Sequence, residues 1–255
     1  MDSDQNIQYE IPLNNRARGL LRLERIFRET FKQIELGTES GHFYALKQIF
    51  VLLDFFARGD FKAELIKTLD SEIAYYARLK DNPAVDLSKL DVFIKQLSQL
   101  NRWAKSQTGK IGHQLLEQEF ISQSRNKLTL ESARLSFDAP AVKCFLATDS
   151  QIRQEQLLEW ISVFKGVQTS VEVILRLSRE TSFFQTAFAE DGYYEEEMEK
   201  DQFQFIGITL PISMKVYPEV SAGPSRFAIH FKQMDDDLSS HEYNKWFDFQ
   251  LAKYR

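Results

Sequence analysis

The chain has 255 residues, 43% of them hydrophobic, which is enough to bury a core as one large domain or two small ones. A formal net charge of −5 argues against a general nucleic-acid-binding surface. With one cysteine, no signal-peptide pattern in the first residues and no apolar run near the roughly 20 residues of a membrane span, we expect a cytoplasmic protein without membrane insertion.

Apolar residues recur at helical spacing through most of the first 180 residues. Leu20, Leu23, Phe27 and Phe31 predict a helix over residues 17–36. Further helices are expected over 42–58, 60–80, 86–103, 111–128 (as one or two pieces), from Pro140, and over 148–182. The last is predicted to be the longest, with Thr148 and Gln151 as a capping box.

After Arg179 the hydrophobic period changes from helical to alternating. Strands are expected near residues 184–188, 203–210, 215–217, 225–231 and 247–251, and a short one near 8–12. The acidic runs Glu195–Glu197 and Asp235–Asp237 are interpreted as solvated hairpin tips. A block of helices before a block of strands predicts an α+β fold with an N-terminal helical domain and a C-terminal antiparallel β-strand domain. We expect a mainly helical domain over 1–182, whose strand near 8–12 joins the β part, and a β-strand domain over 183–255.

The segment from Ser225 to Phe231 is the most informative strand. Phe227, Ile229 and Phe231 fall on one face, and Arg226 and His230 fall on the other, about 13 Å apart at the usual strand rise. One fixed charge and one titratable ring are a poor start for catalysis. They favour the binding of an acidic, extended peptide.

Signatures of common enzymes and metal sites fail in this sequence. It holds no G-x-G-x-x-G motif, no P-loop and no H-E-x-x-H, and Thr108–Lys110 lacks the earlier glycines of a phosphate loop. Cys144 has no neighbouring cysteine and is expected to be a buried core thiol. Asp138 could serve a carboxylate enzyme, but a helix cap before Pro140 explains it more simply. We expect no cofactor and no metal.

Several basic side chains are candidates for binding an acidic partner. Arg18 and Arg22 lie four residues apart and share a helix face, and Lys62 follows Arg58 by one turn. Each of these charges alone is explained as a solvated surface residue. Arg58 at a helix C-terminus is also explained by the helix dipole.

Five ordered stretches of this chain match one protein family. They are YEIPLNNRARGLLR (9–22), LLDFFARGDFKAELIKTLD (52–70), SFDAP (136–140), YPEVSAGPSRFAIHF (217–231) and FDFQLA (247–252). In this combination the chain resembles the ZapD family, the Z-ring-associated division proteins of bacteria. The resemblance implies a non-enzymatic homodimer that binds the acidic C-terminal tail of FtsZ. It also implies that the dimer cross-links FtsZ filaments into bundles at mid-cell, which promotes Z-ring assembly and septation.

The resemblance also assigns residues to the tail-binding surface. It implies that Arg22, Arg58 and Arg226 are retained family arginines, and that His230 stands where the family carries a fourth. Arg18, Lys62 and Lys143 are further candidates. Lys143 is a basic substitute at a partner-linked position, while Glu119 reverses the charge at another.

Three other functions remain open from the residues alone. The protein could be a non-catalytic module for another acidic peptide, an uncharacterised cytosolic enzyme, or a nucleic-acid binder that uses the same basic face. The net negative charge disfavours nucleic acid. An enzyme requires a pocket with clustered carboxylates of raised pKa.

Overall fold

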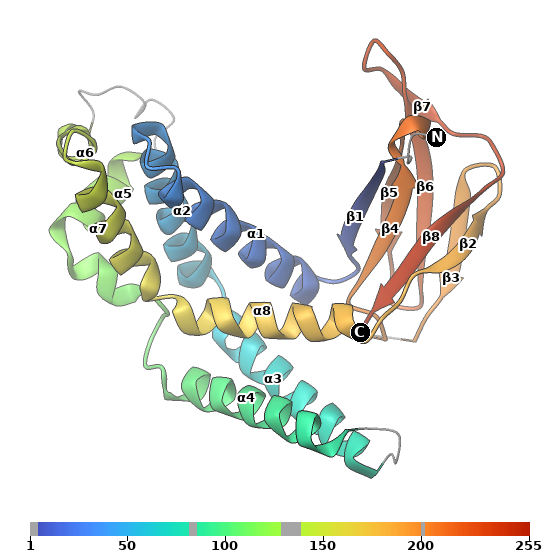
Figure 1. Cartoon of the computed structure of the whole chain (residues 1–255), viewed down its shortest axis with the longest axis horizontal. Coiled ribbons are helices and arrows are strands. Elements are labelled where there is room, and N and C mark those ends of the chain that lie inside the picture. Colours follow the sequence, from blue (N-terminus) through green and yellow to red (C-terminus); the bar gives the residue numbers. More distant parts are fainter. Residues whose placement is uncertain (1–4, 82–85, 129–138, 200–201) are drawn as a thin grey trace. The chain divides into compact units, whose positions relative to one another are not determined.

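The computed structural model describes residues 5–81, 86–128, 139–199 and 202–255 (Figure 1). Helices fill the N-terminal part of the chain and antiparallel strands the C-terminal part, which confirms the predicted α+β fold. The chain divides into two compact units, Met1–Leu21 with Leu175–Arg255, called here the β unit, and Arg22–Ile174, called here the helical unit. The division falls inside the helices α1 and α8. Asp138, considered above as an enzyme carboxylate, lies outside the described residues.

Eight α-helices and three short 3-10 helices are found in the described residues. The α-helices are α1 (Asn15–Glu35), α2 (Glu39–Arg58), α3 (Phe61–Arg78), α4 (Leu87–Ser106), α5 (Glu119–Leu128), α6 (Pro140–Leu146), α7 (Ser150–Ser162) and α8 (Lys165–Glu180). The 3-10 helices are η1 (Leu79–Asp81), η2 (His113–Glu117) and η4 (Ile212–Met214). Helices α3 and α4 pack side by side as a hairpin in the helical unit (Figure 1).

Polar side chains set several helix starts. Thr38 accepts a hydrogen bond from the Gly41 N–H and begins α2. Asp60 does the same for α3, where it accepts from the Ala63 N–H at 3.4 Å. Because Gly59 is all that separates Arg58 from this cap, α2 and α3 are joined by a connection of two residues.

The expectation of one long helix over 148–182 is wrong. The segment forms α7 and α8, and the cap is Asp149, whose carboxylate accepts from the Gln151 N–H at 2.8 Å. The break places Phe164 in the core, fully buried and stacked on Phe56 with ring centroids 5.5 Å apart. A Cβ at Gly166 would lie 2.2 Å from the Trp103 ring, so this glycine permits the close contact that follows the break.

A buried polar cluster ties several segments of the helical unit together. Arg153 donates from Nε to His42 Nδ1 at 2.9 Å and from a terminal nitrogen to the Leu146 carbonyl at 2.9 Å. The other ring nitrogen of His42 contacts the Ile34 carbonyl at 3.0 Å. The buried guanidinium therefore connects α7 to α2 and to the end of α6 through satisfied polar groups.

The β unit holds two antiparallel sheets. The strands are β1 (Asn6–Pro12), β2 (Gln185–Ala189), β3 (Tyr193–Glu197), β4 (Phe205–Pro211), β5 (Val216–Ala222), β6 (Arg226–Met234), β7 (Ser240–Glu242) and β8 (Phe247–Tyr254). One sheet has the order β1-β4-β8-β2, and the other has the order β3-β6-β5 with β7 also on β6 (Figure 1). Both sheets contribute to one hydrophobic core, in which Ile206, Phe227 and Phe249 are buried.

The first strand and the last helix both belong to this unit. Strand β1 pairs with β4, with Tyr9 opposite Ile208. On β1, Glu10 accepts two hydrogen bonds from Arg179 of α8, at 2.8 and 2.7 Å. Such bidentate pairs are strong and directional, so this one fastens the N-terminal segment to the end of α8.

One of the two predicted hairpin tips is a strand instead. Glu195–Glu197 lie in β3, and the turn before it is made by Asp191 and Gly192, both with positive φ. Strand β3 pairs with β6 through its whole length, with Glu197 opposite Arg226. The other acidic run, Asp235–Asp237, lies between β6 and β7, as predicted.

Candidate functional site

Two of the predicted arginines, Arg22 and Arg58, belong to the helical unit. Arg22 of α1 is exposed, and its guanidinium lies 5.7 Å from the ring centroid of Phe55 on α2. Arg58 is also exposed and follows Phe55 by three residues, which places the two on one helix face. Among the described residues neither arginine forms an ion pair. Phe55 thus lies beside Arg22 and on the same helix face as Arg58, and both arginines are exposed.

Arg22, Phe55 and Arg58 are called here the arginine platform, and aromatic packing holds its ring in place. The ring of Phe55 meets those of Phe56 and Phe61 edge to face, each with centroids 5.3 Å apart. A cation above an aromatic face is held by the ring quadrupole, so Phe55 orients Arg22 while it leaves the guanidinium in solvent. Arg58 is the last residue of α2, where its charge also complements the helix dipole.

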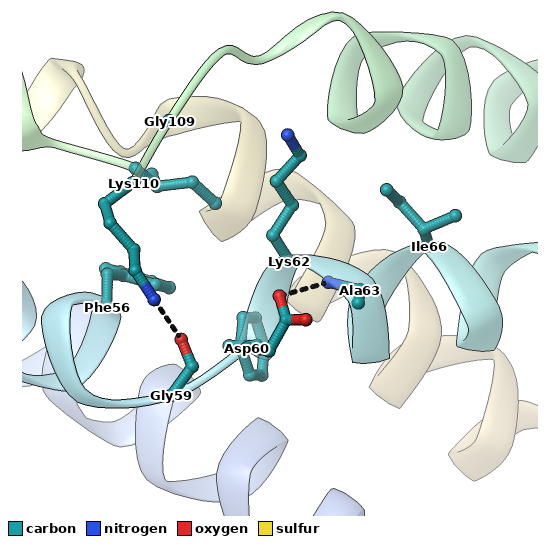
Figure 2. Close-up of a pocket in the computed structure, with 10 residues that line it drawn as sticks. Phe56, Gly59, Asp60, Lys62, Ala63, Ile66, Gly109 and Lys110 are labelled. Atoms are coloured by element: carbon teal, nitrogen blue, oxygen red, sulfur yellow. Dashed lines mark hydrogen bonds between the residues drawn. The ribbon is translucent and has the colours of Figure 1, made fainter.

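Lys62 lies beside a cavity of about 450 Å³ at the α2–α3 junction (Figure 2). Lys62 is half-buried, and its ammonium donates to the Gln107 carbonyl. From the segment after α4, Lys110 reaches to the Gly59 carbonyl at 3.1 Å (Figure 2). Two ammonium groups therefore border one cavity, and both are bonded to main-chain oxygens.

The β unit carries the other predicted residues. On β6, Phe227, Ile229 and Phe231 are fully buried and Arg226 and His230 are exposed, as predicted, whereas Ala228, expected on the same side as Arg226, is also buried. Arg226 and His230 lie on the outer face of the sheet. They belong to the β unit, whereas Arg22 and Arg58 belong to the helical unit.

Carboxylates from the neighbouring strands interrupt the basic face of β6. Arg226 donates to Glu195 of β3 at 3.3 Å. Lys232 lies 3.1 Å from Glu219 of β5, which raises the pKa of the lysine ammonium by a hydrogen bond and by charge attraction. The cations of this strand already have intramolecular partners, and an acidic ligand must compete with them.

His230 is placed beside an aromatic ring. It faces Tyr193 of β3, and the two ring centroids are 4.9 Å apart. The Tyr193 hydroxyl donates to Glu195 at 2.5 Å, a hydrogen bond that raises the pKa of the phenol. Tyr193, Glu195 and Arg226 thus form one connected polar row on the outer face of this sheet.

The remaining candidates lie apart from these contacts. Arg18 is exposed on α1, four residues before Arg22. Lys143 on α6 and Glu119 at the start of α5 are exposed. Glu119 directly precedes Phe120, and Lys143 lies two residues before Phe145, whose ring contacts that of Phe120. Glu119 accepts a hydrogen bond from Gln123 at 2.7 Å. Cys144 is exposed, so the expectation of a buried thiol is wrong: its helix turns Val142 and Leu146 into the core instead.

Sequence reasoning missed two contributors to the helical surface. Phe55 was assigned no role, although its spacing of three from Arg58 already puts it on that residue's face. Lys110 was noted only as part of an incomplete phosphate loop. No local pattern links Lys110 to Gly59, because the contact spans 51 positions of the chain.

Both units of the chain expose basic side chains. An α-helical unit and a two-sheet β unit each expose arginines. In the part of the chain that the structure describes, no group of three or more His, Cys, Asp or Glu could hold a metal ion. No described helix is long and apolar enough to cross a membrane. The chain is thus an α+β protein whose helical unit and β unit each expose arginines.

Comparison with known proteins gives the family. The family model "ZapD: Cell division protein" matches residues 21–230. Cell division protein ZapD of Coxiella burnetii is 31% identical over 230 residues, covering 90% of this chain and 89% of the relative. The ZapD proteins of Cupriavidus necator and Aliivibrio fischeri are each 29% identical, covering 91% and 96% of this chain and 92% and 96% of their own lengths. The chain belongs to the ZapD family of cell division proteins.

Proposed function

We propose that this protein acts in cell division by binding the acidic C-terminal tail of FtsZ. As a homodimer in the cytoplasm, it cross-links FtsZ filaments into bundles at the division site and so promotes septation. The observation that carries the proposal is the exposed pair Arg22 and Arg58, without ion-pair partners among the described residues, in a chain of the ZapD family.

The chemistry of the two surfaces supports an acidic peptide as the ligand. Arginine binds carboxylates through charge-assisted and often bidentate hydrogen bonds. Arg22 and Arg58 offer this directly, whereas Arg226 must first exchange Glu195 for the ligand. We therefore assign the larger share of tail binding to the helical surface and a smaller share to Arg226 and His230.

Weak single contacts suit a cross-linker. A disordered tail loses conformational entropy when it is ordered, so each site binds weakly, with a dissociation constant of about micromolar order. A dimer offers two sites and a filament offers many tails, so the contacts add through effective concentration. Because the arginines are exposed, salt weakens this binding.

Co-sedimentation with assembled FtsZ tests the proposal. The protein is expected to pellet with filaments of full-length FtsZ and to remain in the supernatant with filaments that lack the tail. Arg58→Glu is expected to reduce pelleting, while Arg78→Glu, at the matching last position of α3, keeps it. Equal pelleting with tail-less filaments would refute tail binding. Binding to an unrelated acidic peptide but not to FtsZ would favour a module for another partner.

A further inference from the structure

The cavity at the α2–α3 junction has an apolar floor and a charged border. Its apolar lining comes from Phe56, Phe61, Ile66 and Ile111, and Ala63 lies at its edge on the first turn of α3. The volume of about 450 Å³ falls within the about 300–1,000 Å³ of small-ligand sites. The cavity is therefore large enough for a group bigger than one water molecule or one ion.

The charge at the border is not balanced. Two of the lining residues, Lys62 and Lys110, are positive and one, Asp60, is negative, which leaves +1. The Asp60 carboxylate caps α3 and, among the described residues, forms no ion pair with either lysine. Each ammonium has three donors, of which the structure uses one on a main-chain carbonyl. Both lysines retain donors for an anionic group.

The cavity adjoins the arginine platform described above. Gly59 lines the cavity and directly follows Arg58, and the ring of Phe61 packs against Phe55 beneath Arg22. A peptide held at Arg58 would thus lie next to a residue that borders the cavity. Peptide anchors of this kind pair a buried apolar side chain with polar contacts at the rim.

We propose that this cavity binds one apolar side chain of an acidic peptide, whose neighbouring carboxylate reaches Lys62 and Lys110. The assignment rests on the proposed function, because the peptide is the FtsZ tail held at Arg22 and Arg58. The apolar floor disfavours a free phosphate or nucleotide. In addition, Gly109–Lys110 lacks the earlier glycines of a phosphate loop. Affinity then has an apolar part that salt does not screen.

A variant that fills the cavity tests the assignment. Ala63→Trp places an indole over the floor and leaves every charged side chain in place. Ala77→Trp is the matched control, an exposed alanine on the same helix about 21 Å further along its axis. Binding is measured by fluorescence anisotropy with a labelled synthetic peptide of the FtsZ C-terminus, and folding by circular dichroism.

Ala63→Trp is expected to weaken peptide binding by about tenfold or more, the usual effect of an apolar group in a fitted pocket, while Ala77→Trp stays near wild type. Wild-type affinity in Ala63→Trp would overturn the cavity assignment and leave tail binding at the arginines intact. No binding by the wild-type protein would overturn the proposed function and the cavity assignment together. The wild-type titration thus separates the two failures.

A second measurement on the wild-type protein covers the case in which Ala63→Trp does not fold. The methyl resonances of Ile66 and Ile111 are followed by NMR as the peptide is added. Both are expected to shift with the same saturation curve as the anisotropy. Saturated binding without a shift at either methyl would overturn the assignment.

Discussion

Arg226 on β6 is partly neutralised by Glu195 on β3, and removal of that carboxylate should strengthen binding of an acidic tail. In Glu195→Gln the amide oxygen can still accept the Tyr193 hydroxyl, so the polar row keeps its hydrogen bond. The charge that competes with the ligand is gone. Arg226 is 64% exposed, so its side chain can turn toward a peptide without unfolding the strand.

The size of the gain follows from the pair itself. An exposed ion pair such as Arg226–Glu195, at 3.3 Å, is worth about 0.2–1 kcal/mol. If the ligand no longer has to break it, the dissociation constant falls by about 1.4- to 5-fold. The gain should shrink as salt is raised, because both the pair and the new contact are screened.

Fluorescence anisotropy with the labelled FtsZ tail peptide measures this change. Glu180→Gln is the control, since it removes the same charge from an exposed ion pair, with Arg176 at 3.9 Å, in the same unit. Glu195→Gln should bind more tightly than Glu180→Gln. Equal affinities, or weaker binding by Glu195→Gln, would refute the participation of Arg226 in carboxylate binding.

Two further predictions concern stability. A Cβ at Gly112 would lie 2.5 Å from Phe164, whereas one at Gly109 meets nothing within 4 Å, and both glycines have positive φ. Gly112→Ala should therefore lose about 1–3 kcal/mol more unfolding free energy in urea than Gly109→Ala, and equal losses would contradict the described packing. In the β unit, burial and a hydrogen bond donated to Glu196 raise the pKa of Tyr194 well above its ordinary value. The phenol of the unfolded chain ionises at about pH 10 while the folded one keeps its proton. The free energy of unfolding therefore falls as the pH rises above that value. Tyr194→Phe should show a smaller decline between about pH 9 and 11 in urea midpoints, and an unchanged decline would refute this cause.

The sequence predicts the face of β6 but not its electrostatics. Alternation alone places Arg226 and His230 outward, and the structure agrees. The carboxylate that pairs with Arg226 comes from β3, a strand of successive glutamates, which are poor strand formers and were predicted to lie at a hairpin tip. Cross-strand partners stabilise this strand, since Glu195 meets Arg226 and Glu196 meets Lys253 at 2.6 Å. Such pairing over more than 30 positions leaves no local signal.

The helical surface shows the same division between local and long-range information. Arg58 at a helix end is readable from the Gly-Asp pair that follows it. The break between α7 and α8 is not readable, because Ile161, Phe164 and Val167 continue the helical spacing across it. The cavity is not readable either, since Phe61 and Lys110, which both line it, are far apart in the sequence.

Binding of the isolated FtsZ tail is the central claim, and a calorimetric titration of the tail peptide into the wild-type protein tests it most directly. We predict saturable binding of one peptide per protomer, weakened by Arg58→Glu and retained by Arg78→Glu. An absence of heat and of saturation for the wild-type protein at low salt, with the fold intact, would contradict the claim.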